Sequence, residues 1–327
     1  KYKKKRFFVY SNTCTTLNYH KNNDPNGWMG VRFQLRPDTE PNEVILHVRL
    51  KGTDSLYQQR VLGGVGTNLL FACYWYYDQI EDFIDSLMDN LSNDQLEIDM
   101  IRVTGPDFEN IDNRLLALQL VKKNFTDGTI FGANKEVHQP KDVLYKKNVL
   151  CLRGRFRPVT KVNEDMLKCG LESYRKELGN DDDLVVLSDS TLNNLTGDWD
   201  FANKDFLDRA DILCSLGHTV MVSNCHKHDV LINYLARCKP KHIGIILGIP
   251  NLLELFNEKY YKHSFGEIMR SFGEIFMRNA KMFVYPFQRE KGSEIITLGN
   301  AEVPNNLKYL FKHLKENRYW VDLDGYD

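Results

Sequence analysis

The second half of the chain alternates short apolar segments with amphipathic ones, and this pattern constrains the fold more than any other feature. Strands that are apolar throughout and are joined by helices are typical of a parallel sheet covered on both faces. We therefore expect a Rossmann-like, mainly parallel, three-layer α/β fold. The expected strands are 184–187, 219–222, 243–247, 282–285 and 319–323, and the expected helices are 205–216, 229–238, a helix opening at Asn251, 265–278 and 305–316.

The first half predicts a mixed α/β lobe. Two β-rich runs are separated by a segment that contains Pro37, Asp38, Pro41 and Asn42. These residue types favour a turn, so the two runs are expected to form a hairpin. After the hairpin, apolar residues recur at the spacing of a helix, which predicts helices there. Further short strands are predicted after these helices. The expected strands are 28–35, 43–50, 96–103, 129–132 and one or two strands within 143–152, and the expected helices are 54–77, 79–91 and 114–123. We place the two domains at 1–175 and 184–327, with the polar segment 176–183 as linker.

The charge balance, the cysteines and the length of the apolar segments argue against several classes of protein. The 327 residues carry 43 Lys and Arg against 44 Asp and Glu, a balance that lacks the positive charge typical of nucleic-acid binders. The seven cysteines include no CxxC pair, which favours reduced thiols and a cytoplasmic location. The longest apolar stretch, 65–77, is shorter than the ~20 residues of a membrane-spanning helix. We therefore expect a soluble protein without a membrane span or a nucleic-acid partner.

The beginning of the sequence indicates a longer protein. Lys1 stands where an initiator methionine is expected, and a basic run leads directly into an apolar segment. No apolar region followed by a small-residue cleavage site is found there, so we do not expect a secretory signal. We interpret Lys1 as an interior position of a longer chain.

Small polar residues follow successive predicted strands, where open α/β sheets bind their ligands. Such side chains suit a nucleotide or another phosphorylated small molecule. The alternative is that they act only as helix caps and turn formers. The predicted ligand-binding residues of this edge are Ser188, Thr191, Ser223, Asn224, Gly248 and Asn251.

A row of arginines provides a further candidate for anion binding. Arg153, Arg155 and Arg157 alternate along the sequence, so on a strand their side chains would point to one side. Adjacent like charges are unfavourable unless a partner or a ligand neutralises them. We therefore add these three residues to the predicted ligand site.

Carboxylates supply the only candidates for catalysis. Asp189 follows the strand expected at 184–187, and Asp107 and Asp112 lie near a Gly-Pro turn together with Asp99 and arginines. Carboxylates beside arginines suit acid–base or phosphate chemistry. A surface network of salt bridges is the alternative for Asp107 and Asp112.

Other chemical motifs are weak or missing from the sequence. Cys225, His226 and His228 form the one tract with zinc-ligand residue types, but the pair of histidines lacks a third and a fourth ligand at a recognisable spacing. The phosphate-binding motif GxxxxGK[ST], the dinucleotide motif GxGxxG and the hydrolase motif GxSxG are not found. The sequence therefore predicts no particular metal or cofactor.

Several segments together resemble a widespread bacterial-type family without an established function. The resemblance covers nearly the whole chain, and the family members carry a further N-terminal segment. Some members bear an automatic label, nicotinate-nucleotide adenylyltransferase. The segments are 27–35, 40–50, 97–108, 112–121, 144–160, 205–213, 255–261 and 283–286.

The residues can be compared with the motifs that this label implies. Such transferases carry [HT]xGH after their first strand and a later signature that ends in arginine. Here Ser215-Leu216-Gly217-His218 ends a predicted helix, and Asn194 stands at the position of that arginine. Both motifs are incomplete and they occur in the reverse order.

Two functions remain open from the sequence. The first is a protein, and possible transferase, that binds a nucleotide or phosphorylated metabolite at the sheet edge. The second is a non-catalytic subunit of a homo-oligomer or larger complex, which retains a nucleotide-binding-like fold and acts through its surface. The aromatic residues of 71–77 suit such an interface if Tyr74, Trp75 and Tyr77 are exposed.

Overall fold

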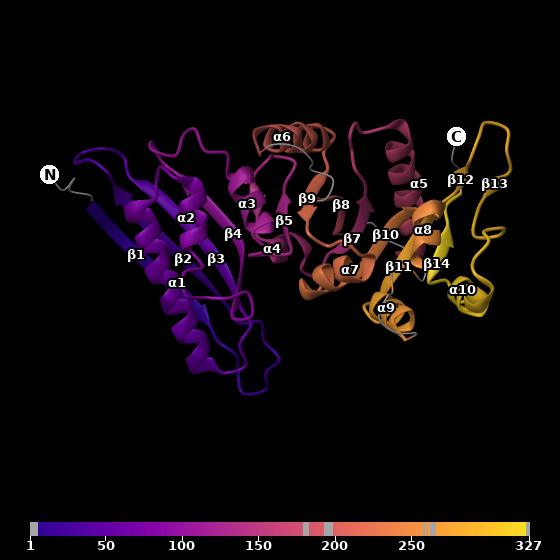
Figure 1. Ribbon diagram of the computed structural model, residues 1–327, viewed down its shortest axis with the longest axis horizontal. Coiled ribbons are helices and arrows are strands. Elements are labelled where there is room, and N and C mark those ends of the chain that lie inside the picture. The colour runs from indigo at the N-terminus through magenta and orange to yellow at the C-terminus, as the bar shows by residue number, and fades with distance from the viewer. Residues whose placement is uncertain are drawn as a thin grey trace. The chain divides into compact units, whose positions relative to one another are not determined.

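The chain forms two compact units. The computed structural model describes residues 6–178, 183–192, 199–257, 259, 261 and 266–324 (Figure 1). Unit 1 comprises Lys1–Gln139 and unit 2 comprises Pro140–Asp327. The segment 176–183, predicted as the linker, falls within unit 2, and its residues 179–182 lie outside the described part of the chain.

Unit 1 is built on a four-stranded antiparallel sheet with the order β1-β2-β3-β4. The predicted hairpin is confirmed, because β2 and β3 pair antiparallel. Alternate residues of β2, including Met29, Val31 and Phe33, are buried in a core that α1 and α2 share. The elements are β1 (Arg6–Thr15), β2 (Asn26–Gln34), β3 (Asn42–Leu50), α1 (Ser55–Trp75), α2 (Ile80–Ser86), β4 (Leu96–Thr104), α3 (Asn113–Lys122), β5 (Gly128–Phe131) and β6 (Val137–His138).

Unit 2 contains the predicted parallel sheet. Its strands lie in the order β14-β11-β10-β7-β8-β9, and each neighbouring pair is parallel. The chain runs outward from β7 to β8 and β9, then returns to β10 on the other side of β7. This reversal is the topological switch point of a doubly wound fold. The strands are β7 (Asn148–Arg153), β8 (Leu184–Thr191), β9 (Thr219–Ser223), β10 (His242–Gly248), β11 (Ala280–Tyr285) and β14 (Trp320–Asp322), with a separate antiparallel pair of β12 (Phe287–Gln288) and β13 (Ile295–Ile296).

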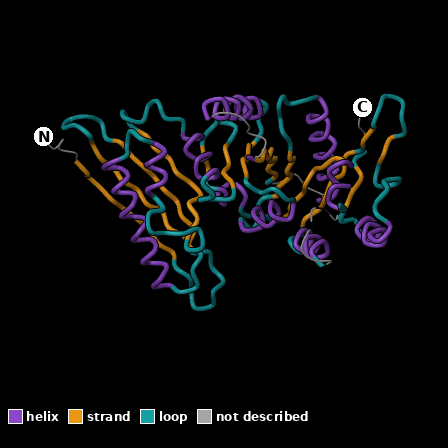
Figure 2. Tube along the Cα trace, viewed as in Figure 1, coloured by secondary structure: helices purple, strands orange, loops and turns teal. Residues whose placement is uncertain are grey.

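Helices cover both faces of this sheet, which confirms the predicted three layers (Figure 2). Helix α5 packs on β7, β10 and β11, and α6 packs on β9. Helices α7 to α10 pack on β10, β11 and β14 from the other face (Figure 1). The helices are α4 (Pro140–Leu144), α5 (Lys161–Leu178), α6 (Trp199–Ser215), α7 (His228–Arg237), α8 (Ile249–Leu255), α9 (Glu267–Phe276), the 3-10 turn η3 (Asn305–Leu307) and α10 (Lys308–Glu316).

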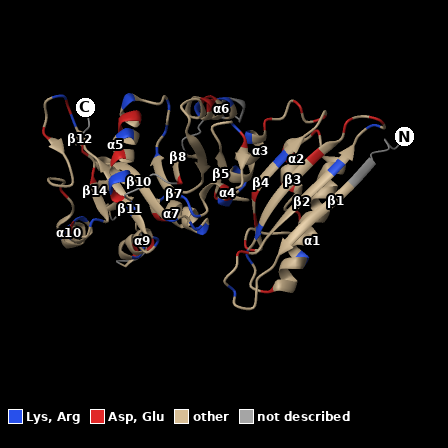
Figure 3. Ribbon diagram, turned by 180° about the vertical axis from the view of Figure 1, so that it is seen from behind, with Lys and Arg blue, Asp and Glu red and all other residues tan. Residues whose placement is uncertain are grey.

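A close approach between α5 and the sheet depends on glycine. Gly244 of β10 lies beneath the ring of Tyr174, where an added Cβ would be 2.6 Å from a ring carbon. Gly170 of α5 faces Ile246 of β10 in the same way. Acidic and basic residues are interspersed along this helix (Figure 3). Helix α5 therefore has a narrow buried face, and its exposed face carries charged side chains.

Several elements differ from the sequence prediction. Helix α5 was not predicted, and the segment 143–152, predicted as strand, contains the end of α4 as well as most of β7. Strand β8 continues to Thr191 rather than ending at Leu187, because β7 and β9 both pair with its polar end. The predicted start of helix 265–278, Phe265, lies outside the described residues.

Candidate functional site

A buried ion pair joins the carboxyl ends of β7 and β8. Arg153 is the last residue of β7 and stands in register with Asp189 of β8. Nε of Arg153 lies 2.7 Å from Oδ2 of Asp189, and the two side chains are 11% and 0% exposed. The backbone nitrogen of Gly154 also donates to the carbonyl oxygen of Asp189 at 3.0 Å. The chain is thus held close to β8 where it leaves β7.

The register of the strands shows which side chains share a face. Thr191 of β8 is paired with Ser223 of β9, and side chains alternate along a strand. Asp189 and Ser223 therefore lie on the same face as Arg153. The opposite face carries Ser188 and Ser190, together with the residues that contact α5.

His228 approaches the ion pair from the first turn of α7. The burial of the imidazole and the nearby Arg153 cation lower the pKa of His228 to about 3. The ring is therefore neutral at neutral pH. Its Nε2 atom is buried.

Four buried polar atoms on this face find no hydrogen-bond partner in the described part of the chain. They belong to residues that we call the polar cluster. Buried polar groups are nearly always paired in native proteins, so each unpaired atom calls for an explanation. All four atoms are closed off from solvent, so a ligand at this edge reaches them only if neighbouring side chains move. The atoms are Arg153 Nη2, Asp189 Oδ1, Ser223 Oγ and His228 Nε2.

The predicted arginine row is wrong, because β7 ends at Arg153. Arg155 and Arg157 lie in the following loop, and both are exposed. Between them Phe156 has a φ of 47° and a buried ring. This turn separates the three arginines: one belongs to the polar cluster and two face solvent.

The loop after β7 is attached to α6. Arg209 Nη1 donates to the carbonyl oxygen of Arg155 at 3.0 Å. Arg157 Nε lies 3.4 Å from Oδ1 of Asp205, which also pairs with Arg209. These contacts hold the loop that contains Arg155 and Arg157 in a defined position at the sheet edge.

The remaining predicted ligand residues lie at strand ends but differ in exposure. Thr191 and Asn224 are partly buried, and Gly248 ends β10. Asn251 is exposed and does not cap α8, because this helix begins earlier, with Gly248 as its cap and a proline in its first turn. Thr191 and Asn224 are therefore less accessible to solvent than Asn251.

Ser188 has a partner of its own on the α5 face. Its Oγ lies 2.9 Å from Nδ1 of His218, and the serine is fully buried. Burial lowers the pKa of His218, and the carboxylate of Glu164 raises it in part. The pair accounts for Ser188 without a ligand. Asn194, which stands at the position of the missing signature arginine, lies outside the described residues.

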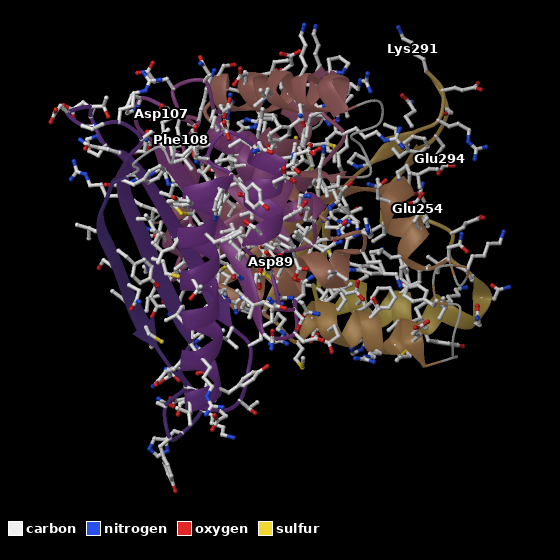
Figure 4. All side chains as sticks on the ribbon, turned by 60° about the vertical axis from the view of Figure 1, so that its left-hand side comes forward. Asp89, Asp107, Phe108, Glu254, Lys291 and Glu294 are labelled. Carbon is white, nitrogen blue, oxygen red and sulfur yellow. The ribbon has the colours of Figure 1, made fainter. Side chains whose placement is uncertain are left out.

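The carboxylates of unit 1 have structural partners. Asp107 lies beside Phe108 in the loop after β4 and accepts a hydrogen bond from Asn42 at 2.8 Å (Figure 4). Asp112 caps α3 and pairs with Arg114 at 2.7 Å. Asp99 is buried against His47, with 2.5 Å between Oδ1 and Nδ1. These contacts favour the structural interpretation of the three acids.

The three residues that the sequence offers as weak zinc ligands lie in different environments. Cys225 is buried, His226 is exposed, and His228 belongs to the polar cluster. Within the described ranges, no three or more His, Cys, Asp or Glu side chains are grouped so that they could hold a metal ion. His228, which the sequence suggested only as a weak metal ligand, instead lies beside Arg153.

Comparison of the chain with protein-family models, with curated proteins and with solved structures gave no match. Among the helices that the structure describes, none has both the length and the apolar character needed to cross a membrane.

Proposed function

We propose that unit 2 binds a nucleotide or another phosphorylated small molecule at the carboxyl ends of β7, β8 and β9. The observation that carries this proposal is the polar cluster, whose four buried atoms have no partner in the described part of the protein. Its position beside the topological switch of a parallel sheet supports the proposal, since ligands of such sheets bind there. Arg155, exposed in the loop that follows Arg153, adds a cation near the same strand end, and Arg157 of this loop pairs with Asp205.

Thermal denaturation with a panel of ligands tests the proposal. The panel contains nucleoside mono-, di- and triphosphates and sugar phosphates. A ligand present at 100 times its Kd should stabilise the protein by about 2.7 kcal/mol. If no member of the panel raises the melting temperature, the proposal is wrong.

Two serine variants test the position of the site. Ser223→Ala removes one hydroxyl of the polar cluster, and Ser190→Ala removes a buried, unpartnered hydroxyl from the other face of the neighbouring strand. We expect the first change to reduce the ligand-induced shift and the second to leave it unchanged. Equal effects of both changes would contradict a site on the face that carries Arg153.

A surface interaction is the second candidate function, and exposed aromatic rings on α1 favour it. Phe71 and Trp75 are 44% and 55% exposed, and their ring centroids are 6.4 Å apart. Tyr74 is partly buried, and Tyr77 packs against the core of unit 1. If these rings form a contact between copies, Trp75→Ala should lower the mass measured by sedimentation. The matched change Tyr19→Ala, at a residue that is 95% exposed, should not.

A further inference from the structure

The outer face of α1 carries no charged side chain over most of its length. The inner face packs on the four-stranded sheet of unit 1 through residues such as Val61, Val65 and Leu69 (Figure 1). Residues 61–77, which supply both faces, include no Asp, Glu, Lys or Arg. A surface helix normally carries charged or polar side chains toward solvent, and an exposed apolar patch marks an interaction site. The outer face of α1 therefore has the character of a surface that is covered by a partner.

Four exposed residues at intervals of four form one ridge along this outer face. The first two are small, Gly63 and Thr67, and the last two are aromatic, Phe71 and Trp75. Apart from the neighbouring turns of the helix, nothing in the described part of the chain lies within 4 Å of a Cβ added to Gly63. The hydroxyl of Thr67 donates to the carbonyl oxygen of Gly63 at 3.0 Å, so it can be buried without a further partner. The ridge thus has a depression at Gly63 and Thr67 and two protruding rings beyond it.

Opposite charges stand at the two ends of the ridge. Arg60 precedes Gly63 by one turn of α1, and Asp78 follows the end of the helix; both are exposed. Two copies of α1 that pair antiparallel about a two-fold axis bring each end against the opposite end of the partner. An alignment centred on the middle of the ridge places Gly63 opposite Trp75, and Arg60 opposite Asp78. The ridge is therefore complementary to itself in shape and in charge.

We propose that α1 pairs antiparallel with α1 of a second copy of this chain, so that the two rings of each copy cover the depression of the other. This inference rests on the second candidate function, a contact between copies, and adds the alignment of that contact. A strongly charged partner would meet no opposite charge along residues 61–77. One helix face is smaller than a standard interface of ~800 Å² per partner, so the dimer should have a Kd in the micromolar range.

Sedimentation equilibrium over a series of protein concentrations tests the fit at the depression. Gly63→Leu adds bulk where the single chain has open space, so the fold should tolerate it, which circular dichroism checks. The same bulk would collide with the rings of the second copy, and we expect the Kd of the dimer to rise about 10-fold or more. Gly273→Leu is the matched control, because Gly273 is also an exposed helical glycine with nothing within 4 Å of an added Cβ in the described residues. It should leave the Kd unchanged.

A charge exchange tests the antiparallel alignment. Arg60→Glu and Asp78→Arg should each raise the Kd about 5-fold, because each places like charges opposite one another in both halves of the dimer. The double variant Arg60→Glu/Asp78→Arg should recover the original Kd, since it restores both pairs with the signs reversed.

The outcomes separate this inference from the candidate function on which it rests. If the unmodified protein stays monomeric throughout the concentration series, both are wrong. If Trp75→Ala dissociates the dimer but Gly63→Leu does not, the copies meet through the rings in another arrangement, and only the inference is wrong. A double charge variant that associates no better than the single ones would likewise overturn the antiparallel alignment alone.

Discussion

Replacing Arg153 by methionine tests how strongly the ion pair of the polar cluster contributes to the stability of unit 2. The guanidinium lies 2.7 Å from Asp189, whose side chain is fully buried. Methionine keeps a long unbranched side chain but removes the cation. The carboxylate of Asp189 then stays buried without a positive partner, which is the costly state of a buried charge.

The loss in free energy of unfolding that we expect for Arg153→Met lies near the lower limit for buried ion pairs. Removing one partner of such a pair costs about 3–5 kcal/mol. Arg153 is still 11% exposed, so water can partly replace the lost cation. We therefore expect Arg153→Met to lower the free energy of unfolding by about 3 kcal/mol. The double variant Arg153→Met/Asp189→Leu should recover most of this loss, because neither charge remains.

Equilibrium urea denaturation followed by circular dichroism measures these differences as free energies of unfolding. Arg153→Lys is the matched control, since it keeps the positive charge and loses only the fixed geometry of the guanidinium. A loss below about 1 kcal/mol for Arg153→Met, the range of exposed pairs, would refute the reasoning. So would a double variant no more stable than the single one.

Two further predictions concern packing and pH. Gly244→Ala should destabilise unit 2 by about 1–3 kcal/mol, because its Cβ would lie 2.6 Å from the Tyr174 ring. Gly273→Ala, in α9 with nothing within 4 Å of the added Cβ, should be neutral or stabilising by up to about 1 kcal/mol in the same urea titrations. A hydrogen bond from Lys281 lowers the pKa of Glu177 below its ordinary 4.5, although burial opposes the shift. Its contribution is complete above pH 4.5 and is lost as the pH falls through the lowered value. Glu177→Gln should therefore cost about 1 kcal/mol at neutral pH, and the difference should vanish in acid; a pH-independent difference would contradict this.

The long apolar runs made most of the fold predictable. Strands such as 243–247 consist of residues that must be buried on both faces, so a parallel sheet with two helical layers follows from them. Helix α5 could not be predicted in this way, because only a narrow stripe including Leu167, Gly170 and Tyr174 is buried. Its packing depends on a glycine in the partner strand, which is distant in the sequence.

The candidate site was predicted only in part. Ser223 and Asp189 follow from the rule that ligands bind at the carboxyl ends of parallel strands. The arginine row was wrong, since a strand end and a turn at Phe156 cannot be read from alternation alone. His228 carried only a weak metal signal, because its environment depends on how α7 packs beside β7.

The sequence by itself determined the class of fold and the edge at which polar side chains gather. Both follow from local properties, namely the period of apolar residues and the position of polar residues after them. Only the tertiary structure decided which of those side chains act together. Arg153, Asp189, Ser223 and His228 come from four separate segments, and the strand order and register bring them to one face. Within the described part of the chain, burial leaves one atom of each without a hydrogen-bond partner, and no sequence pattern records this because burial depends on the whole fold.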